Sequence, residues 1–222
     1  MYGLLLVLAI LICLLIAESL VKKSGRDINI FWGTALYSIV SGIIGARLYH
    51  VAHLWNYYED NPIKIFQIWN GGLGIFGAII GGLLGAIIYL KMRKQNILEW
   101  LDIAGLVLPL GQAIGRWGNF FNGELYPYFL YESVLDLLLF LMLFLRHLTA
   151  RASSAMIPGR TFALYLLGYS GIRFFLEPFR TNSWQIYNLN TAQLISIILA
   201  GVSVLILRKG RGGKFGARSD LS

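Results

Sequence analysis

A ten-residue polar stretch, residues 115–124, directly follows an apolar run that is long enough to cross a membrane. It reads Gly-Arg-Trp-Gly-Asn-Phe-Phe-Asn-Gly-Glu and contains Arg116, Asn119, Asn122 and Glu124. Polar side chains at membrane depth are costly unless they pair with one another or contact water, so such a cluster indicates a functional site. An arginine guanidinium binds phosphate through two parallel N–H groups. The stretch therefore predicts a site for an anionic ligand that carries a phosphate.

Helical spacing places Gln112 and Asn119 beside Arg116. The three residues lie at positions i, i+4 and i+7, which share one face of an α-helix. A simpler interpretation is a membrane helix whose terminal arginine extends to the interface. The additional amide and carboxylate side chains favour a ligand site over that interpretation.

A second polar run has the same spacing near the end of another apolar segment. Arg173, Glu177 and Arg180 again lie at i, i+4 and i+7. We expect Glu177 to pair with Arg173 and orient it, which leaves positive charge for a ligand. Pro178 is expected to bend or end the helix, because proline has no backbone N–H and its ring clashes with the preceding turn.

Several acidic residues lie at predicted membrane depth. Glu132 and Asp136 are four residues apart at the start of a further apolar run, and they are candidate acceptors for the nearby arginines. Glu18 and Asp102 are solitary acids toward the other side of the membrane. We interpret these two as structural or interfacial.

The elements that must position these residues are membrane helices. Of the 222 residues, 57% are hydrophobic and only 14% are charged, well below the charged share of a soluble domain. Apolar runs of spanning length recur along the whole chain. They predict an all-α integral membrane protein with seven transmembrane helices, at residues 2–21, 29–54, 72–90, 97–116, 128–146, 161–179 and 191–207.

The first run has no basic leader and no small-residue cleavage site, so we interpret it as a membrane helix of the mature protein rather than a signal peptide. The seven helices are predicted to form one domain over residues 1–207, followed by a basic cytoplasmic tail over residues 208–222. The glycine-rich run between residues 71 and 85 predicts close packing against another helix.

The distribution of basic residues predicts the orientation. Most of the 19 Lys and Arg residues follow the first, third, fifth and seventh spans, which places those ends in the cytoplasm and the amino terminus outside. Topology and anionic lipid headgroups account for the net charge of +8, so no nucleic-acid partner is predicted. Four arginines depart from the rule and gather near the outer ends of spans: Arg47, Arg116, Arg173 and Arg180. A phospholipid phosphate in the outer leaflet would account for them.

Cysteine and metal chemistry are not indicated. The only cysteine, Cys13, lies inside the first apolar run and is interpreted as a small buried hydrophobic residue. We find no spacing typical of metal ligands, and we predict neither a metal nor another cofactor.

Residues 115–124 fit the pattern G-R-x-G-N-F-x-N-x-E, which resembles the signature of the bacterial prolipoprotein diacylglyceryl transferase family. Other segments resemble that family in the same order, and the resemblance covers nearly the whole chain. They are Gly45–Leu48, Gly71–Gly74, Phe129–Ser133, Gly171–Arg173 with Glu177 and Arg180, and Gln193.

The resemblance implies an activity. The family transfers the diacylglyceryl group of phosphatidylglycerol to the lipobox cysteine thiol of a preprolipoprotein, so that a thioether forms and glycerol phosphate leaves. This is the first step of bacterial lipoprotein maturation. The implied partners are phosphatidylglycerol, a preprolipoprotein signal peptide with its lipobox cysteine, and membrane lipids. The implied location is the bacterial cytoplasmic (inner) membrane, with several spans and the active site toward the outer leaflet.

The resemblance also implies residue roles. Arg116 is expected to bind the lipid phosphate and Arg173, oriented by Glu177, to stabilise the developing charge, with Tyr169 near the site. The expected catalytic residues are therefore Arg116, Arg173, Glu177 and Tyr169. The residues expected to bind phosphatidylglycerol are Arg116, Asn119, Asn122, Glu124, Arg47, Gln112 and Arg180.

Two departures from the family pattern bear on the mechanism. Many members carry a histidine where this chain has Phe76, so the group that accepts the thiol proton is unassigned. Tyr169, His50 and Glu177 are candidates, and the arginines alone can lower the pKa of the substrate thiol. The outer segment after Glu124 is also shorter than usual in the family, which bears on how the peptide substrate is handled.

Two alternative functions use the same arginines. One is a transporter or channel for an anionic lipid or solute. The other is an inactive scaffold derived from the transferase. A transporter is expected to show inverted repeats, and we find no convincing repeat in the sequence.

Overall fold

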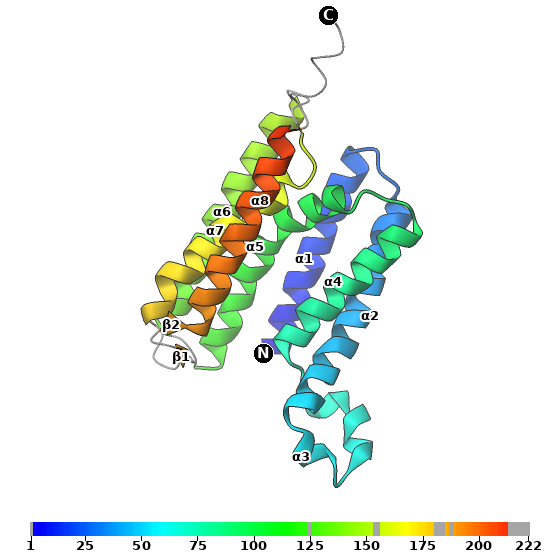
Figure 1. The fold of residues 1–222 in the computed structure, drawn as a ribbon, viewed down its shortest axis with the longest axis vertical. Helices are drawn as coiled ribbons and strands as arrows, with labels where there is room; N and C mark the ends of the chain where they lie inside the picture. Colours follow the sequence, from blue (N-terminus) through cyan, green and yellow to red (C-terminus); the bar gives the residue numbers. More distant parts are fainter. Residues whose placement is uncertain (1, 124–125, 153–155, 180–184, 187–188, 213–222) are drawn as a thin grey trace, which may run out of the picture. The chain divides into compact units, whose positions relative to one another are not determined.

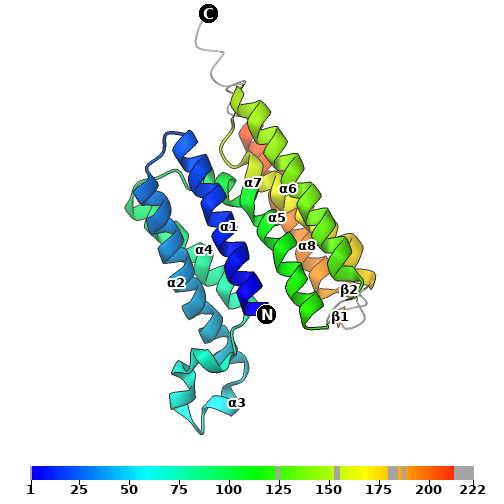
Figure 2. The same cartoon turned by 180° about the vertical axis from the view of Figure 1, so that it is seen from behind.

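The chain folds into helices that group into two compact units. The computed structural model describes residues 2–123, 126–152, 156–179, 185–186 and 189–212 (Figures 1 and 2). One unit comprises Met1–Leu20 and Leu98–Ser222, and the other comprises Val21–Ile97. We refer to them as the larger and the smaller unit.

The larger unit carries the helices on which most of the predicted site residues lie. Its elements are α1 (Tyr2–Lys23, whose last turn belongs to the smaller unit), α5 (Ile97–Phe121), α6 (Tyr128–Ala152), α7 (Arg160–Leu176), the 3-10 helix η3 (Glu177–Phe179), the strands β1 (Gln185–Ile186) and β2 (Leu189–Asn190), and α8 (Thr191–Gly212). Helices α5, α6, α7 and α8 run side by side, and α7 packs against both α6 and α8 (Figures 1 and 2). The two short strands pair antiparallel in the connection between α7 and α8.

The smaller unit is a helical hairpin with a folded connection. Helices α2 (Ile28–His53) and α4 (Ile75–Met92) pack along their length, and the connection between them contains α3 (Trp55–Tyr58) and the 3-10 helices η1 (Pro62–Phe66) and η2 (Ile68–Asn70). Figure 1 shows this connection at one end of the α2–α4 pair.

Six helices of the described residues are long and apolar enough to cross a membrane: α1, α2, α4, α5, α6 and α8. Their outward faces carry large exposed apolar side chains, including Leu4, Leu15, Leu36 and Leu205. The all-helical membrane character predicted from the sequence is confirmed. The predicted count of seven spans is not.

The difference in the count lies in α7. The sequence predicted a span over residues 161–179, but α7 has 17 residues, ends at Leu176 and continues only as the 3-10 turn η3. Pro178 lies in that turn, and its missing N–H accounts for the early end of the α-helix. By contrast, α5 continues to Phe121, beyond the predicted boundary at residue 116, so Arg116 and Asn119 both lie in its helical part.

A buried carboxylate starts α7. Asp102 on α5 is 8% exposed, and it accepts hydrogen bonds from the backbone N–H groups of Gly159 (2.8 Å) and Phe162 (2.9 Å). These donors belong to the first turn of α7, whose N–H groups have no partner within the helix. The structural role predicted for Asp102 is confirmed.

Glycines allow α2 and α4 to approach backbone to backbone. A Cβ atom added to Gly45 would overlap the carbonyl oxygen of Gly77, and one added to Gly77 would overlap the carbonyl oxygen of Gly45. Ser38 reinforces the contact, since its hydroxyl donates to the carbonyl of Gly82 at 3.0 Å. The close packing predicted for the glycine-rich run is confirmed, with the geometry expected for small residues in membrane helices.

We predict that Gly77→Val destabilises the detergent-solubilised protein by about 1–3 kcal/mol, because a side chain there forces α2 and α4 apart. Thermal unfolding followed by circular dichroism measures the effect. Gly201→Ala is the matched control, because an added Cβ at Gly201 meets no heavy atom within 4 Å. Equal melting temperatures for the two variants would contradict the packing described above.

Candidate functional site

Four charged side chains form a chain of ion pairs where α5 ends, α6 begins and α7 ends. A single oxygen of Glu132, Oε1, accepts from Arg116 Nη2 at 2.7 Å and from Arg173 Nη1 at 2.9 Å. Arg173 Nη2 donates to Glu177 Oε2 at 2.5 Å. We call these four residues, Arg116, Glu132, Arg173 and Glu177, the ion-pair cluster. The structure thus brings together two arginines that are 57 positions apart in the sequence.

The four side chains differ in exposure. Glu132 and Glu177 are nearly inaccessible, at 3% and 5%, whereas the Arg173 side chain is 12% exposed and the Arg116 side chain 21%. The two guanidinium groups and the two carboxylates have no net formal charge. Because its side chain is the most exposed of the four, Arg116 is the member most open to an incoming anion.

Buried polar contacts fix the helix ends that carry the cluster. The Ser133 hydroxyl donates to the carbonyl of Ala113 at 2.8 Å and ties α6 to α5. The Asn190 amide donates to the carbonyl of Glu177 at 3.3 Å, and the Gln193 amide to that of Phe174 at 3.4 Å. These last two contacts join β2 and the start of α8 to the end of α7, and so help hold Glu177 in place.

A second set of polar side chains lies one helical turn below the ion-pair cluster. Gln112 is one turn before Arg116 on α5, and its Nε2 donates to the Tyr165 hydroxyl at 3.0 Å. The ring of Tyr165 stacks on that of Tyr169, with centroids 6.0 Å apart. On α6 the same level is occupied by Asp136, which is 0% exposed. We call Gln112, Asp136, Tyr165 and Tyr169 the lower layer.

Other predicted site residues of the larger unit lie near the cluster along the chain. Asn119 is half-buried in the last turn of α5, and Asn122 is exposed just after the helix, where its N–H donates to the carbonyl of Gly118. Glu124 and Arg180 lie outside the described residues. Their predicted roles stay predictions, as does that of Asn122.

Arg47 lies in the smaller unit and has a different set of partners. Its side chain donates to the backbone carbonyls of five residues of the α2–α4 connection: Lys64, Ile65, Gln67, Gly71 and Gly72. The residue is 7% exposed, and its guanidinium also lies 5.2 Å from the centre of the Tyr58 ring. In the structure Arg47 holds this connection in its fold. The phosphatidylglycerol-binding role suggested by the sequence stays a prediction, and its donors are already engaged.

A hollow of about 330 Å³ adjoins Arg47 in the same unit. His50, Tyr57, Lys64 and Asn70 are among the residues that line it. Phe76, which the resemblance aligns with a histidine, lies in the first turn of α4 and packs near the ring of Tyr49. Of the three candidate proton acceptors, Tyr169 and Glu177 lie in or beside the ion-pair cluster, and His50 lies in this other unit.

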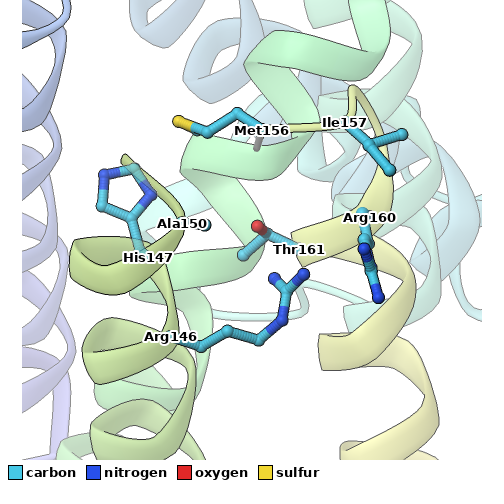
Figure 3. Close-up of a pocket in the computed structure, with 7 residues that line it drawn as sticks. All are labelled: Arg146, His147, Ala150, Met156, Ile157, Arg160 and Thr161. Atoms are coloured by element: carbon cyan, nitrogen blue, oxygen red, sulfur yellow. The ribbon is translucent and has the colours of Figure 1, made fainter. Parts of the chain in front are cut away.

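A hollow at the opposite end of α6 and α7 is separate from the candidate site. Figure 3 shows Arg146 extending from α6 beneath Thr161, with Arg160 of α7 also at its edge. It lies at the ends that the charge distribution assigns to the cytoplasm. The remaining lining residues are His147, Ala150, Met156 and Ile157.

The sequence pointed to three of the four cluster residues and gave Glu132 no role beyond a candidate acceptor. Glu132 was detectable as an acid at the start of a span, but its place between two arginines depends on how three helices pack. Tyr165 and Asn190 had no signal in the sequence. The Tyr165 hydroxyl accepts from Gln112, 53 positions away, and the Asn190 amide donates to the carbonyl of Glu177, 13 positions away.

The ion-pair cluster predicts a large effect of Glu132→Gln. Loss of this carboxylate leaves Arg116 and Arg173 without their shared acceptor, and breaking a buried pair costs about 3–5 kcal/mol. We expect a clear fall in the thermal midpoint of the purified protein. Glu59→Gln serves as control, because Glu59 is exposed in the α2–α4 connection. A Glu132→Gln protein as stable as Glu59→Gln would show that the cluster is not held by this residue.

Comparison with known proteins gives a consistent set of relatives. The model of the prolipoprotein diacylglyceryl transferase family matches residues 1–208. A phosphatidylglycerol–prolipoprotein diacylglyceryl transferase of Symbiobacterium thermophilum is 40% identical, over 93% of this chain and 86% of the relative. Enzymes of the same name from Staphylococcus xylosus and Clostridioides difficile are each 37% identical, over 94% and 89% of this chain and 84% and 85% of the relatives.

Proposed function

The chain belongs to the prolipoprotein diacylglyceryl transferase family, and from that membership we propose where and how its reaction takes place. It is a membrane transferase that moves a diacylglyceryl group from phosphatidylglycerol to a prolipoprotein. We propose the ion-pair cluster as the place where the phosphate is held. The observation that carries this proposal is the single Glu132 oxygen that joins Arg116 to Arg173.

The cluster offers what the reaction requires. The attacked glyceryl carbon carries a phosphodiester oxygen as its leaving group, so negative charge grows on the phosphate as the bond breaks. Donors that are already fixed in a water-poor site stabilise such charge most effectively. Arg116 and Arg173 are fixed by Glu132 and Glu177, which removes most of the cost of ordering two long side chains at the moment of reaction.

The sulfur of the lipobox cysteine attacks the glyceryl carbon, and a C–S bond forms. The C–O bond to the phosphate breaks, and its electron pair stays on the phosphate oxygen. The thiol proton is transferred, and glycerol phosphate carries it away. Thiolate is the reactive form of the cysteine, so a group near the site must accept this proton.

The residues of α5 and α7 take distinct parts in this proposal. Arg116, the more exposed arginine, binds the lipid phosphate, and Arg173, oriented by Glu177, stabilises the charge on the leaving group. Asn119, Asn122, Glu124 and Gln112 bind the headgroup or shape its cavity. Arg180 and Arg47 remain candidate contacts for phosphatidylglycerol, and Tyr169 remains a candidate proton acceptor.

The site assignment predicts that Arg116→Ala and Arg173→Ala each lower thioether formation at least about 100-fold, as loss of a donor to a developing charge does elsewhere. Purified protein receives phosphatidylglycerol vesicles and a lipobox peptide, and mass spectrometry quantifies the modified peptide. Lys91→Ala, an exposed cation near the end of α4, is the control and should keep full activity. Unchanged turnover in both arginine variants would reject the site, and no product from the wild type would reject the activity.

We also propose the membrane arrangement: seven spans in the bacterial cytoplasmic membrane, with the amino terminus outside and the site toward the outer leaflet. Helix α7 has 17 residues, about 26 Å at 1.5 Å per residue. Because α7 packs between the spanning helices α6 and α8, it crosses with them and ends inside the outer half of the bilayer. The polar site at its end would then lie at the depth of the lipid phosphate.

Cysteine labelling tests this arrangement, because Cys13→Ala gives a cysteine-free background. Glu59→Cys places a thiol in the exposed α2–α4 connection, and Ser24→Cys places one in the exposed turn after α1. A membrane-impermeant maleimide should label Glu59→Cys in intact cells and Ser24→Cys only after permeabilisation. The reverse pattern would invert the proposed orientation.

A further inference from the structure

Asp136 is a buried acid that the mechanism above does not use. Its side chain is 0% exposed, and neither carboxylate oxygen has a hydrogen-bond partner among the residues that the structure describes. One other buried side-chain oxygen in the described part of the chain is in the same condition, Oε1 of Gln112. Buried polar atoms are nearly always hydrogen-bonded, so three such atoms in one region require a physical explanation.

The packing of α5, α6 and α7 places all three oxygens below the ion-pair cluster, which is the proposed phosphate site. Glu132 contacts Arg116, and one turn further into the membrane α6 carries Asp136 while α5 carries Gln112. Glu132 also contacts Arg173, and one turn deeper on α7 is Tyr169. Asp136 therefore shares a level with Gln112 and Tyr169, directly beneath the ion-pair cluster.

Protonation of Asp136 gives two of the three oxygens a hydrogen bond, from one Asp136 oxygen to Gln112 Oε1, and leaves the third oxygen uncharged. All three are acceptors when the acid is ionised, and an unpaired carboxylate in a dry interior is very costly. A protonated carboxyl has one O–H donor. Gln112 already uses its Nε2 as donor to Tyr165, so its Oε1 is the acceptor that remains on that amide.

The charges around Asp136 agree with a neutral acid. From α5 it faces Arg116, from its own helix Glu132, and from α7 Tyr165, Tyr169 and Arg173. Both arginines are already paired with Glu132 or Glu177. Glu132, one turn away, disfavours a second negative charge at Asp136.

We propose that Asp136 holds a proton, shares it with Gln112, and exchanges it with the reacting groups through the hydroxyl of Tyr169. This proposal rests on the transferase function. The sulfur displaces the phosphate in one step, so the C–S bond forms as the glyceryl C–O bond breaks. In that step Tyr169 gives its proton to the leaving phosphate oxygen and takes one from Asp136, and the thiol proton passes through Tyr169 to Asp136. The net transfer is one proton from thiol to glycerol phosphate, and Asp136 ends as it began. Asp136 is a positioning residue that acts through Tyr169. This chain has Phe76 where many members of the family have a histidine, so another group must handle the proton.

The first test compares Asp136→Asn with the wild type in the vesicle and lipobox-peptide assay. Asparagine keeps the size and can still donate to Gln112, but it cannot exchange a proton. We expect kcat to fall about 100-fold or more, as loss of general acid–base assistance does, while KM for phosphatidylglycerol changes less than about threefold. Asp136→Glu keeps a carboxyl, so its kcat should lie between those of Asp136→Asn and the wild type.

The pH profile separates proton exchange from packing. In the wild type, kcat should fall as pH rises through the ionisation of Asp136, and Asp136→Asn should lack that limb. Ser133→Ala is the matched structural control on the same helix, because it loses a buried hydrogen bond to α5 and no titratable group. Ser133→Ala should be less stable than the wild type, and the pH profile of its kcat should be unchanged. Full activity of Asp136→Asn, or a wild-type pH profile in that variant, would overturn the proposal.

The second test does not depend on activity or on the folding of Asp136→Asn. Infrared spectra of the wild type should contain the C=O stretch of a protonated carboxyl that shifts in D₂O, and Gln112→Leu should move it to higher frequency. Absence of such a band, or a band insensitive to Gln112→Leu, would refute the shared proton. If the wild type forms no thioether but shows the band, the proton is placed correctly and the transfer role fails with the transferase.

Discussion

The need to pair every charge inside the membrane organises this structure. An ionised side chain at membrane depth is tolerated where it meets an opposite charge or a set of backbone dipoles. One oxygen of Glu132 pairs with both Arg116 and Arg173, and Glu177 also pairs with Arg173. The four side chains meet at one level, and their contacts hold the end of α7 against the first turns of α6 and the last turns of α5.

The smaller unit meets the same constraint by other means. Its buried arginine, Arg47, donates to five backbone carbonyls of the connection between α2 and α4. That connection carries several exposed aromatic and aliphatic side chains, among them Phe66 and Trp69. Glycine contacts bring α2 and α4 together, and Arg47 then organises the segment between them. Arg47 thus has a structural part in this unit, and the phosphatidylglycerol contact expected from the sequence stays a prediction.

Features that depend on residues close together in the sequence were predictable, and features that depend on how the helices pack were not. Apolar runs gave six of the helices, because length and composition decide whether a segment can span. The pairing of Arg173 with Glu177 followed from helical spacing alone. The contact of Arg116 with Glu132 did not, because it depends on the register between two helices. The orphaned oxygens of Asp136 and Gln112 could not be inferred either, since each residue type usually has a partner. Pro178 predicted that the helix would bend or end close by, but the predicted boundary at residue 179 lies three residues after the observed end of α7 at Leu176.

Charge balance links the ion-pair cluster to the residue beneath it. The cluster is neutral by itself, so a bound phosphodiester brings its charge to minus one, and an ionised Asp136 would bring the total to minus two in a site with little water. Coulomb repulsion between unit charges a few ångströms apart is several kcal/mol at the effective dielectric constant of a protein interior. In the proposed mechanism a bound phosphate therefore keeps Asp136 protonated until the reaction begins. Substrate binding and proton exchange are then coupled through Arg116 and Arg173.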